Sequence, residues 1–347
     1  MRPDSTASPS RRHRDHPSYE EVVVSANSVD ELLRPRPVGK TGLMVTPIGV
    51  GGAPLGDMTT DFAYVVPEDR ALDTVRAWLD SPINFMDTAA YYGDGTSERR
   101  IGTVLRERGG LPQGKVLETK ADRNVTNGDW SGDQMRRSVE RSLRLLGMDS
   151  LQICLLHDPE TTTFEEITRK GGALEALVRM KEEGLIQHLG IGAGDTQVIM
   201  RYVELGVMEV VMTHNRFNLL DQEAEPLMDL CQARGIAVFN AAPYGSGILA
   251  KGPDAFARFR YREASPTLVE RVRRMQAICD RHGVPLAAAA LQFSIRDPRV
   301  TSTVVGMTRP ERIRETIELA TYPIPEDLWE ELAPMSRSRE GLPTGLP

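Results

Sequence analysis

INFMDTAAYYGDGTSERR, residues 83–100, decides the fold because it holds a strand, a loop and the start of a helix in one run. The apolar residues 83–86 end on Asp87. Two tyrosines and a glycine-rich turn follow, and a helical pattern begins at Ser97. Asp87 and Tyr92 therefore flank the end of a predicted strand, where both side chains can face the same space.

The next two apolar runs also end on a polar, ionisable side chain. KVLETK ends on Lys120 and LQICLLH ends on His157. A carboxylate beside a tyrosine raises the pKa of the phenol, whereas an ammonium lowers it. A lysine between Asp87 and Tyr92 would thus favour proton transfer by the phenol.

Outward from this stretch, strands and helices alternate along most of the chain. This alternation predicts a parallel sheet, and eight repeats predict a closed (β/α)8 TIM barrel. A doubly wound open sheet is the alternative, but GVGGAPLG does not fit the G-x-G-x-x-G fingerprint. Residues 36–52 predict a β-hairpin before the barrel. The expected strands are 45–50, 83–86, 116–119, 151–156, 188–191, 209–213, 236–240 and 301–305.

The composition argues against a nucleic-acid-binding, membrane-spanning or secreted protein. The chain has 347 residues and a net charge of −7, and no long basic block suggests a nucleic-acid surface. No apolar run reaches the roughly 18 residues typical of a membrane span. The first residues lack the apolar core of a secretory signal. An odd number of cysteines, Cys154, Cys231 and Cys279, suggests free thiols and a cytoplasmic location.

Three segments are expected. Residues 1–30 are polar and predict a disordered N-terminal extension. Residues 31–335 predict the barrel, and residues 336–347 a C-terminal tail.

The carboxyl ends of parallel barrel strands open on one face, where catalytic groups of such barrels lie. Asp87, Tyr92, Lys120 and His157 are therefore the candidate catalytic residues. Tyr92 would donate a proton to a carbonyl that receives a hydride, Lys120 would stabilise the phenolate, Asp87 would hold Lys120, and His157 would orient the carbonyl oxygen. A cofactor must supply the hydride. Each residue alone has an ordinary structural explanation, but four at consecutive strand ends indicate a catalytic site.

These residues resemble a known family. DTAAYYGDGTSERRIGTVL is similar to the aldo-keto reductase signature, and VLETK and LLHDPE match the strands that carry its lysine and histidine. The resemblance extends over about residues 36–322. It implies a (β/α)8 barrel that interconverts carbonyls and alcohols with NADP(H) or NAD(H) and without a metal. HDPE and NAAPYGSGIL are most similar to the branch acting on sugars (D-threo-aldose, fucose, galactose) and pyridoxal.

The resemblance also implies cofactor contacts. NAAPYGSGIL resembles the loop whose backbone amides meet the pyrophosphate, and VVGMTRPERIRETIE resembles the segment around the adenosine half. An ordinary glycine turn and a solvated helix start are the structural alternatives. The candidate cofactor residues are Asn215, Tyr244, Gly245, Ser246, Gly247, Leu249, Gly306, Thr308, Arg309, Arg312 and Glu315.

Three positions depart from the family pattern. Ala193-Gly194 replaces a frequent Ser-Asn, His214-Asn215 stands where Gln is frequent, and Ala241 replaces an aromatic residue. The residues that would contact the nicotinamide carboxamide are therefore not predicted. His214 is either a carboxamide donor or a core histidine.

Two other functions remain as alternatives. A metal-dependent barrel hydrolase needs histidines after the first strand, and GVGGAP has none. A barrel that binds cofactor and regulates a partner without turnover is the second. The expected substrate is a small carbonyl compound or sugar, enclosed by loops 53–67, 122–131 and 251–266, and the oligomeric state is not predicted. The candidate substrate contacts are Phe256, Phe259, Tyr261, Trp130, Asp122 and Arg123.

Overall fold

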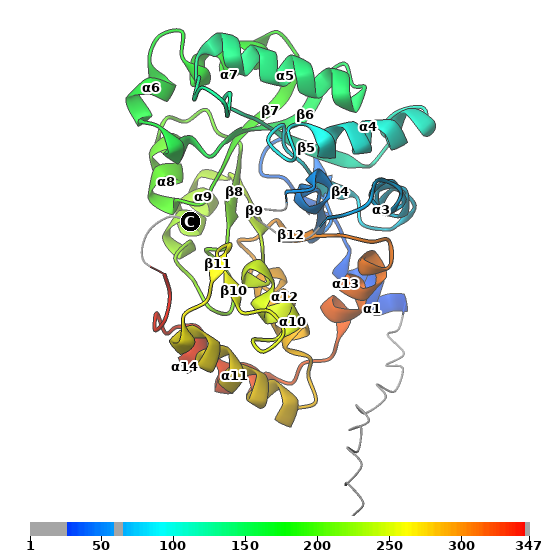
Figure 1. The fold of residues 1–347 in the computed structure, drawn as a ribbon, viewed down its shortest axis with the longest axis vertical. Helices are drawn as coiled ribbons and strands as arrows, with labels where there is room; N and C mark the ends of the chain where they lie inside the picture. The colour runs from blue at the N-terminus through cyan, green and yellow to red at the C-terminus, as the bar shows by residue number, and fades with distance from the viewer. Residues whose placement is uncertain (1–25, 59–64, 344–347) are drawn as a thin grey trace, which may run out of the picture.

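The computed structural model describes residues 26–58 and 65–343. Within them, eight parallel strands close into a barrel in which β12 pairs with both β3 and β9 (Figure 1). This confirms the predicted TIM barrel. The barrel strands are β3 (Ile48–Gly51), β4 (Phe85–Asp87), β5 (Val116–Ala121), β6 (Leu151–His157), β7 (Ile186–Ala193), β8 (Val210–His214), β9 (Ala237–Ala241) and β12 (Ser302–Gly306).

Helices surround the barrel and bury their apolar faces against it (Figure 1). The helix of residues 132–146 shows the sequence signals that start and stop these helices. The Ser131 side chain accepts a hydrogen bond from the Gln134 amide, and Gly147 ends the helix at φ +71°. The outer helices are α3 (Glu68–Asp80), α4 (Thr96–Glu107), α5 (Gly132–Leu146), α7 (Ala173–Glu182), α8 (Thr196–Glu204), α9 (Glu225–Arg234), α12 (Leu286–Ile295) and α13 (Glu311–Thr321).

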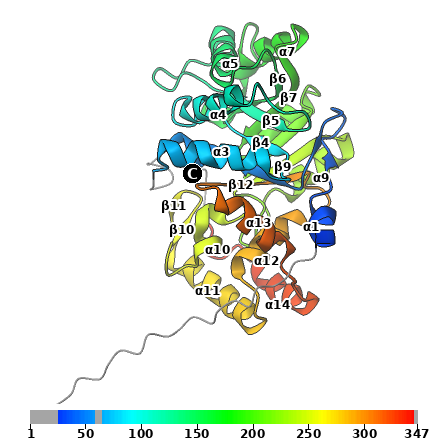
Figure 2. The ribbon, with the colours of Figure 1, turned by 90° about the vertical axis from the view of Figure 1, so that its right-hand side faces the viewer.

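The N-terminal region differs in detail from the prediction. The hairpin pairs β1 (Arg36–Pro37) with β2 (Met44–Val45), and the first barrel strand begins only at Ile48. Pro47 separates the two because it has no N–H to donate to a strand ladder. Residues 26–30, predicted as disordered, lie in α1 (Ala26–Leu32), which sits beside α13 (Figures 1 and 2). Residues 1–25 of the predicted extension lie outside the described residues, and the segment boundaries stay predictions.

The long interval after β9 contains structure that the sequence did not predict. It holds two short helical segments, η3 (Gly245–Gly247) and α10 (Ile248–Lys251), and the hairpin β10 (Arg258–Phe259)–β11 (Arg262–Glu263). A last helix, α14 (Glu326–Ser336), packs against α11 (Pro266–Arg281). The remaining short elements are η1 (Ala53–Gly56), η2 (Pro159–Thr161) and α6 (Phe164–Thr168).

The barrel interior is filled by its own small apolar cluster, separate from the layer between strands and helices. Phe85 and Phe239 meet across it with ring centroids 4.5 Å apart. The cluster includes Phe85, Ile153, Leu155, Val210, Met212, Phe239 and Val304.

Gly102 fixes the close crossing of α4 and α5. A Cβ atom at this position would lie 1.9 Å from the Leu145 carbonyl oxygen. We expect Gly102→Ala to lower the free energy of unfolding by about 1–3 kcal/mol, because the overlap outweighs the better helix propensity of alanine. Urea unfolding measures this, with Thr103→Ala on the same helix as the control. Equal stability of the two variants would show that the helices separate freely.

Helices of the described residues are too short or too polar to cross a membrane. Among the same residues, no group of three or more His, Cys, Asp or Glu side chains is placed to hold a metal ion.

Candidate active site

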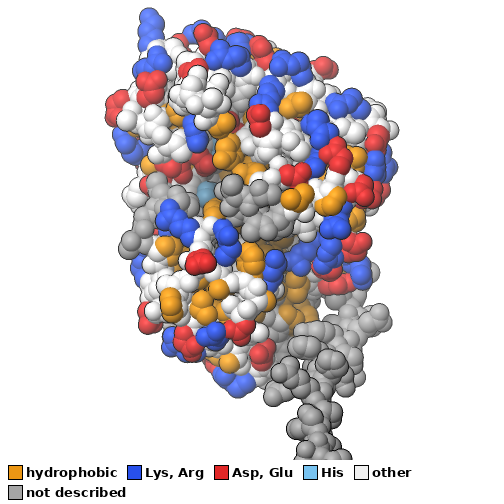
Figure 3. Space-filling view, viewed as in Figure 1, with side chains coloured by type: hydrophobic (Ala, Val, Ile, Leu, Met, Phe, Trp, Pro, Cys, Tyr) orange, Lys and Arg blue, Asp and Glu red, His pale blue; other side chains and the backbone are white. Residues whose placement is uncertain are grey.

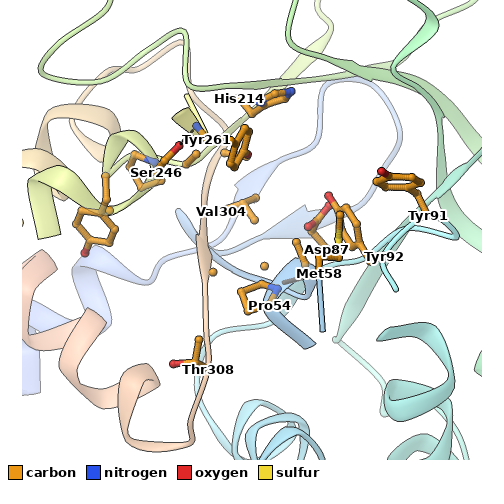
Figure 4. Close-up of a pocket in the computed structure, with 18 of the residues that line it drawn as sticks. Pro54, Met58, Asp87, Tyr91, Tyr92, His214, Ser246, Tyr261, Val304 and Thr308 are labelled. Carbon is orange, nitrogen blue, oxygen red and sulfur yellow. Dashed lines mark hydrogen bonds between the residues drawn. The ribbon is translucent and has the colours of Figure 1, made fainter. Parts of the chain in front are cut away.

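A cavity of about 950 Å³ opens at the carboxyl ends of the strands. In the space-filling view, a histidine is visible with hydrophobic side chains near it (Figure 3). Asp87 and Tyr92 lie together on one side, while Ser246, Tyr261 and His214 come from the opposite side (Figure 4). Residues 59–64 of the predicted substrate loop lie outside the described residues.

The four candidate catalytic residues all line this cavity. The Lys120 ammonium forms an ion pair with Asp87, donates to the Thr88 carbonyl at 2.7 Å and donates to the Tyr92 Oη at 3.2 Å. The His157 ring stands edge-on to the Tyr92 ring with centroids 5.8 Å apart. The phenol thus lies beside a buried cation and an imidazole in the lining of the cavity.

Local packing holds the loop that carries Tyr92. A Cβ at Gly93 would lie 1.7 Å from the Gly56 carbonyl oxygen, and the residue has φ +61°. Both features require glycine here. Beneath the loop, the Ser97 hydroxyl bonds to Thr88 Oγ1 and donates to the Gly52 carbonyl, each at 2.9 Å. The glycine-rich turn and Ser97 of the opening motif therefore fix where Tyr92 stands.

The protonation of the pair differs from the expectation in one respect. Burial lowers the pKa of Lys120, but Asp87 and Glu118 outweigh it and hold that pKa well above its usual value. Burial, reinforced by Asp87, raises the pKa of Tyr92 well above 10, and Lys120 only opposes this. The net direction is thus the reverse of the lowered pKa expected for Tyr92: the phenol is held protonated, and Lys120 is the neighbour that favours loss of its proton.

Glu118 is a second carboxyl group beneath the lysine. It is fully buried in the barrel interior, and its Oε1 lies 3.5 Å from Lys120 Nζ. Burial raises the pKa of Glu118 well above its usual value. Glu118 and Asp87 therefore both face the same buried ammonium, and Asp87 forms the closer ion pair with it.

The predicted substrate contacts divide into two groups. Phe256 and Tyr261 line the cavity. Trp130 and Phe259 are buried away from it, at 3% and 1% exposure. The predicted contacts of Asp122 and Arg123 with substrate are also not found in the cavity lining, because Asp122 bonds to His157 instead.

Most predicted cofactor residues reach the cavity. Tyr244, Ser246, Gly247, Gly306, Thr308, Arg309 and Arg312 line it, whereas Asn215, Gly245, Leu249 and Glu315 lie behind it. Several amides of the predicted pyrophosphate loop are already used, because those of Gly247 and Leu249 both donate to the Tyr244 carbonyl. Ser246, at φ 62°, carries the polar side chain of this loop into the cavity.

Two arginines at the far end of the cavity share one carboxylate. Arg309 binds Glu315 in a bidentate pair at 2.6 and 2.9 Å, and Arg312 lies 3.4 Å from the same group. Arg309, Arg312 and Glu315 together carry a net positive charge that can attract a phosphate. Glu315, and Glu311 at 3.8 Å from Arg309, already neutralise part of the charge of the arginines.

Two of the three departures from the family pattern lie together at the ends of β7 and β8, and the third, Ala241, ends β9 and also lines the cavity. Ala193 has no polar side chain, and Glu160 fills the space beside it by accepting the Gly194 amide at 2.8 Å. Glu160 Oε2 has no hydrogen-bond partner among the described residues, and burial raises the pKa of this group to about 7. His214 lines the cavity next to Gly194, and burial lowers its pKa to about 4. Sequence reasoning missed Glu160, although the polar DPE following His157 was a usable signal.

These groups fit a dinucleotide with an amide at one end and a phosphate at the other. A neutral imidazole and an orphaned carboxyl oxygen can meet a carboxamide, and the arginine pair can meet a phosphate. His214 and Arg312 both line this one cavity.

At the carboxyl-terminal rim of this (β/α)8 barrel, a tyrosine, a lysine, an aspartate and a histidine thus lie together around one cavity. The profile of the Aldo/keto reductase family matches residues 47–336. The chain belongs to this family and is an enzyme acting on CH–OH donors, as the sequence resemblance predicted.

Curated relatives agree with this assignment. A pyridoxal 4-dehydrogenase from Microbacterium luteolum is 32% identical over 335 residues, covering 86% of this chain and 96% of its own. A D-threo-aldose 1-dehydrogenase from a Pseudomonas species is 30% identical, covering 84% and 94%. Among solved structures, the holo form of aldo-keto reductase AKR11C1 from Bacillus halodurans aligns with a TM-score of 0.68 at 22% identity, covering 87% of this chain and 96% of that one. This last likeness supports the fold.

Proposed function

We propose that this protein is an NAD(P)-dependent oxidoreductase that interconverts a carbonyl and an alcohol, with Tyr92 as the general acid and base. One observation carries the proposal: the Tyr92 Oη lies 3.2 Å from the Lys120 ammonium, and both residues line the cavity. A phenol in that position donates its proton to a carbonyl oxygen while the ammonium stabilises the phenolate left behind.

Each remaining residue has a role in this reaction. Asp87 holds Lys120 charged and in place through the buried ion pair. His157 orients the substrate oxygen from the side opposite Lys120. A bound nicotinamide cofactor would supply or accept the hydride. His214 and Glu160 would hold its carboxamide, Ser246 its pyrophosphate, and Arg309 and Arg312 its adenosine half.

The substrate is a small aldehyde, aldose or pyridoxal-like ring. Two relatives have names that specify pyridoxal and an aldose, and identity near 30% supports a substrate class rather than one compound. Tyr91, Phe256 and Tyr261 give the cavity aromatic walls beside polar groups. Such walls can stack on a sugar or a pyridine ring. A cytoplasmic location stays a prediction.

Nucleotide titration followed by turnover tests this proposal. Purified protein is titrated with NADPH and NADH by fluorescence, and then assayed with pyridoxal, aldoses and simple aldehydes at the nicotinamide absorbance band. We expect binding and an absorbance change with at least one substrate of this panel. Binding without turnover of any substrate would instead support the regulatory barrel.

The Glu315 carboxylate sets how strongly the arginine pair favours NADPH. Because Glu315 neutralises part of the charge of Arg309 and Arg312, we expect Glu315→Gln to raise the ratio of the Kd for NADH to that for NADPH by about 10-fold. Fluorescence titration of both nucleotides measures the ratio. Glu318→Gln is the matched control, because Glu318 pairs with Arg314 on the outer face of the same helix. An unchanged ratio in Glu315→Gln would remove the arginine pair from the 2′-phosphate site.

A further inference from the structure

Asp122 and His157 form a buried hydrogen-bonded pair at the edge of the active site. His157 Nδ1 lies 2.7 Å from Asp122 Oδ1, and the two residues are 7% and 5% exposed. The pair joins the ends of two neighbouring strands, since Asp122 follows β5 and His157 ends β6. Such a carboxylate accepts the Nδ1 hydrogen and fixes which ring nitrogen carries it.

Every polar atom of Asp122 forms a hydrogen bond. Its Oδ2 accepts the Tyr91 amide at 2.8 Å, its amide donates to Ser138 Oγ at 3.0 Å, and its carbonyl accepts from Gln134 Nε2 at 3.1 Å. The carboxylate therefore cannot swing away from His157 without losing the Tyr91 contact. Its two oxygens are assigned, one to a backbone amide and one to the imidazole.

We propose that Asp122 is a positioning residue that holds His157 as an imidazolium, with Nδ1–H on Asp122 and Nε2–H directed at the reacting oxygen. This rests on the proposed function, because it specifies how His157 contacts the substrate. A charged donor makes a stronger hydrogen bond to a developing alkoxide than a neutral one does. A second positive charge beside Tyr92 also favours its phenolate.

Other charges around His157 leave this assignment intact. Asp158 Oδ2 lies 3.7 Å from Nε2, outside hydrogen-bond distance, so the Nε2 hydrogen stays available. Burial and Lys120 lower the pKa of His157, but Asp122 and Asp158 outweigh them and raise it above 6.5. The neighbouring rings of Tyr92 and Tyr91 stand edge-on, at 5.8 and 6.3 Å between centroids.

The sign of the pH dependence follows from the tautomer. Above its pKa, the neutral His157 keeps Nδ1–H on Asp122 and has a bare Nε2, which cannot donate to a carbonyl. Carbonyl reduction is therefore expected to fall as pH rises through the pKa of His157.

The variant Asp122→Asn is expected to reverse the tautomer. The Tyr91 amide still donates to the oxygen of the new side-chain amide, so the NH2 group of that side chain faces His157 Nδ1 and donates to it. That ring stays neutral with its hydrogen on Nε2.

Nitrogen-15 NMR of histidine-labelled protein tests the inference without turnover. We expect His157, assigned by its loss in His157→Gln, to titrate above pH 6.5 in the wild type and to become the Nδ1–H tautomer when neutral. In Asp122→Asn its pKa should fall by more than one pH unit and the tautomer should change to Nε2–H. Asp158→Asn is the matched control, with a smaller fall and an unchanged tautomer.

The kinetic counterpart is the pH profile of kcat/KM for reduction. We expect the fall of kcat/KM that follows loss of the His157 proton to be absent in Asp122→Asn. At low pH, kcat/KM of this variant should be about 10-fold lower than that of the wild type. A wild-type His157 that titrates below 6.5, or is Nε2–H when neutral, would overturn the inference even if the variant does not fold. Absence of turnover would count against the proposed function alone, because the NMR result decides the inference separately.

Discussion

Tyr92→Phe is expected to lower kcat for carbonyl reduction by about 10²- to 10⁴-fold, the usual contribution of a general acid. The substitution removes only the hydroxyl that contacts Lys120 at 3.2 Å. The ring, its edge contact with His157 and the wall of the cavity remain. The Kd of the nicotinamide nucleotide should therefore change little, and steady-state kinetics with fluorescence titration separates the two quantities.

Tyr91→Phe is the matched control for this variant. Tyr91 is the adjacent tyrosine, lines the same cavity and also meets the His157 ring edge-on, at 6.3 Å between centroids. Its loss of a hydroxyl should change kcat by less than about 10-fold, since it has no role as the acid. Equal losses in the two variants would mean that the cavity needs phenols for binding and that Tyr92 is not the acid.

Lys120→Met is expected to remove activity and stability together. The ammonium is 1% exposed and is the charged partner of Asp87. Removing one partner of a buried ion pair costs about 3–5 kcal/mol because the other charge stays buried. Loss of the cation beside the phenolate costs about 10²- to 10³-fold in kcat. Urea unfolding and steady-state kinetics measure the two effects.

The double variant Asp87→Asn, Lys120→Met separates these effects. It removes both members of the ion pair, and burial raises the pKa of the neighbouring Glu118, which favours the neutral form of that carboxyl once the cation is gone. Most of the lost stability should return while kcat stays low. Recovery of kcat in the double variant would show that Lys120 serves the fold and not the reaction.

The sequence predicted the barrel and the four catalytic candidates because both depend on local patterns. Asp87 and His157 end apolar runs that form β4 and β6, and parallel strands bring such ends to one rim. Lys120 lies one residue before the end of β5, which still directs it to the cavity. The roles of these residues stay predictions for the variants above.

Contacts between segments that are distant in the chain could not be predicted from the sequence. Asp122 looked like a loop residue for substrate, since nothing in its surroundings indicates a bond to His157 in the next strand. The pairing of Arg309 with Glu315 depends on how the chain turns into α13. The hairpin β10–β11 has strands of two residues each, which are too short to give a period-2 pattern.

One measurement tests the central claim most directly: the nicotinamide absorbance during turnover of wild type and Tyr92→Phe with the same nucleotide, compared over the panel of pyridoxal, aldoses and aldehydes. The structure predicts an absorbance change with wild type, a rate at least about 100-fold lower with Tyr92→Phe, and equal nucleotide affinity for both. Near-normal turnover by Tyr92→Phe would contradict the proposed chemistry of the Tyr92–Lys120 pair.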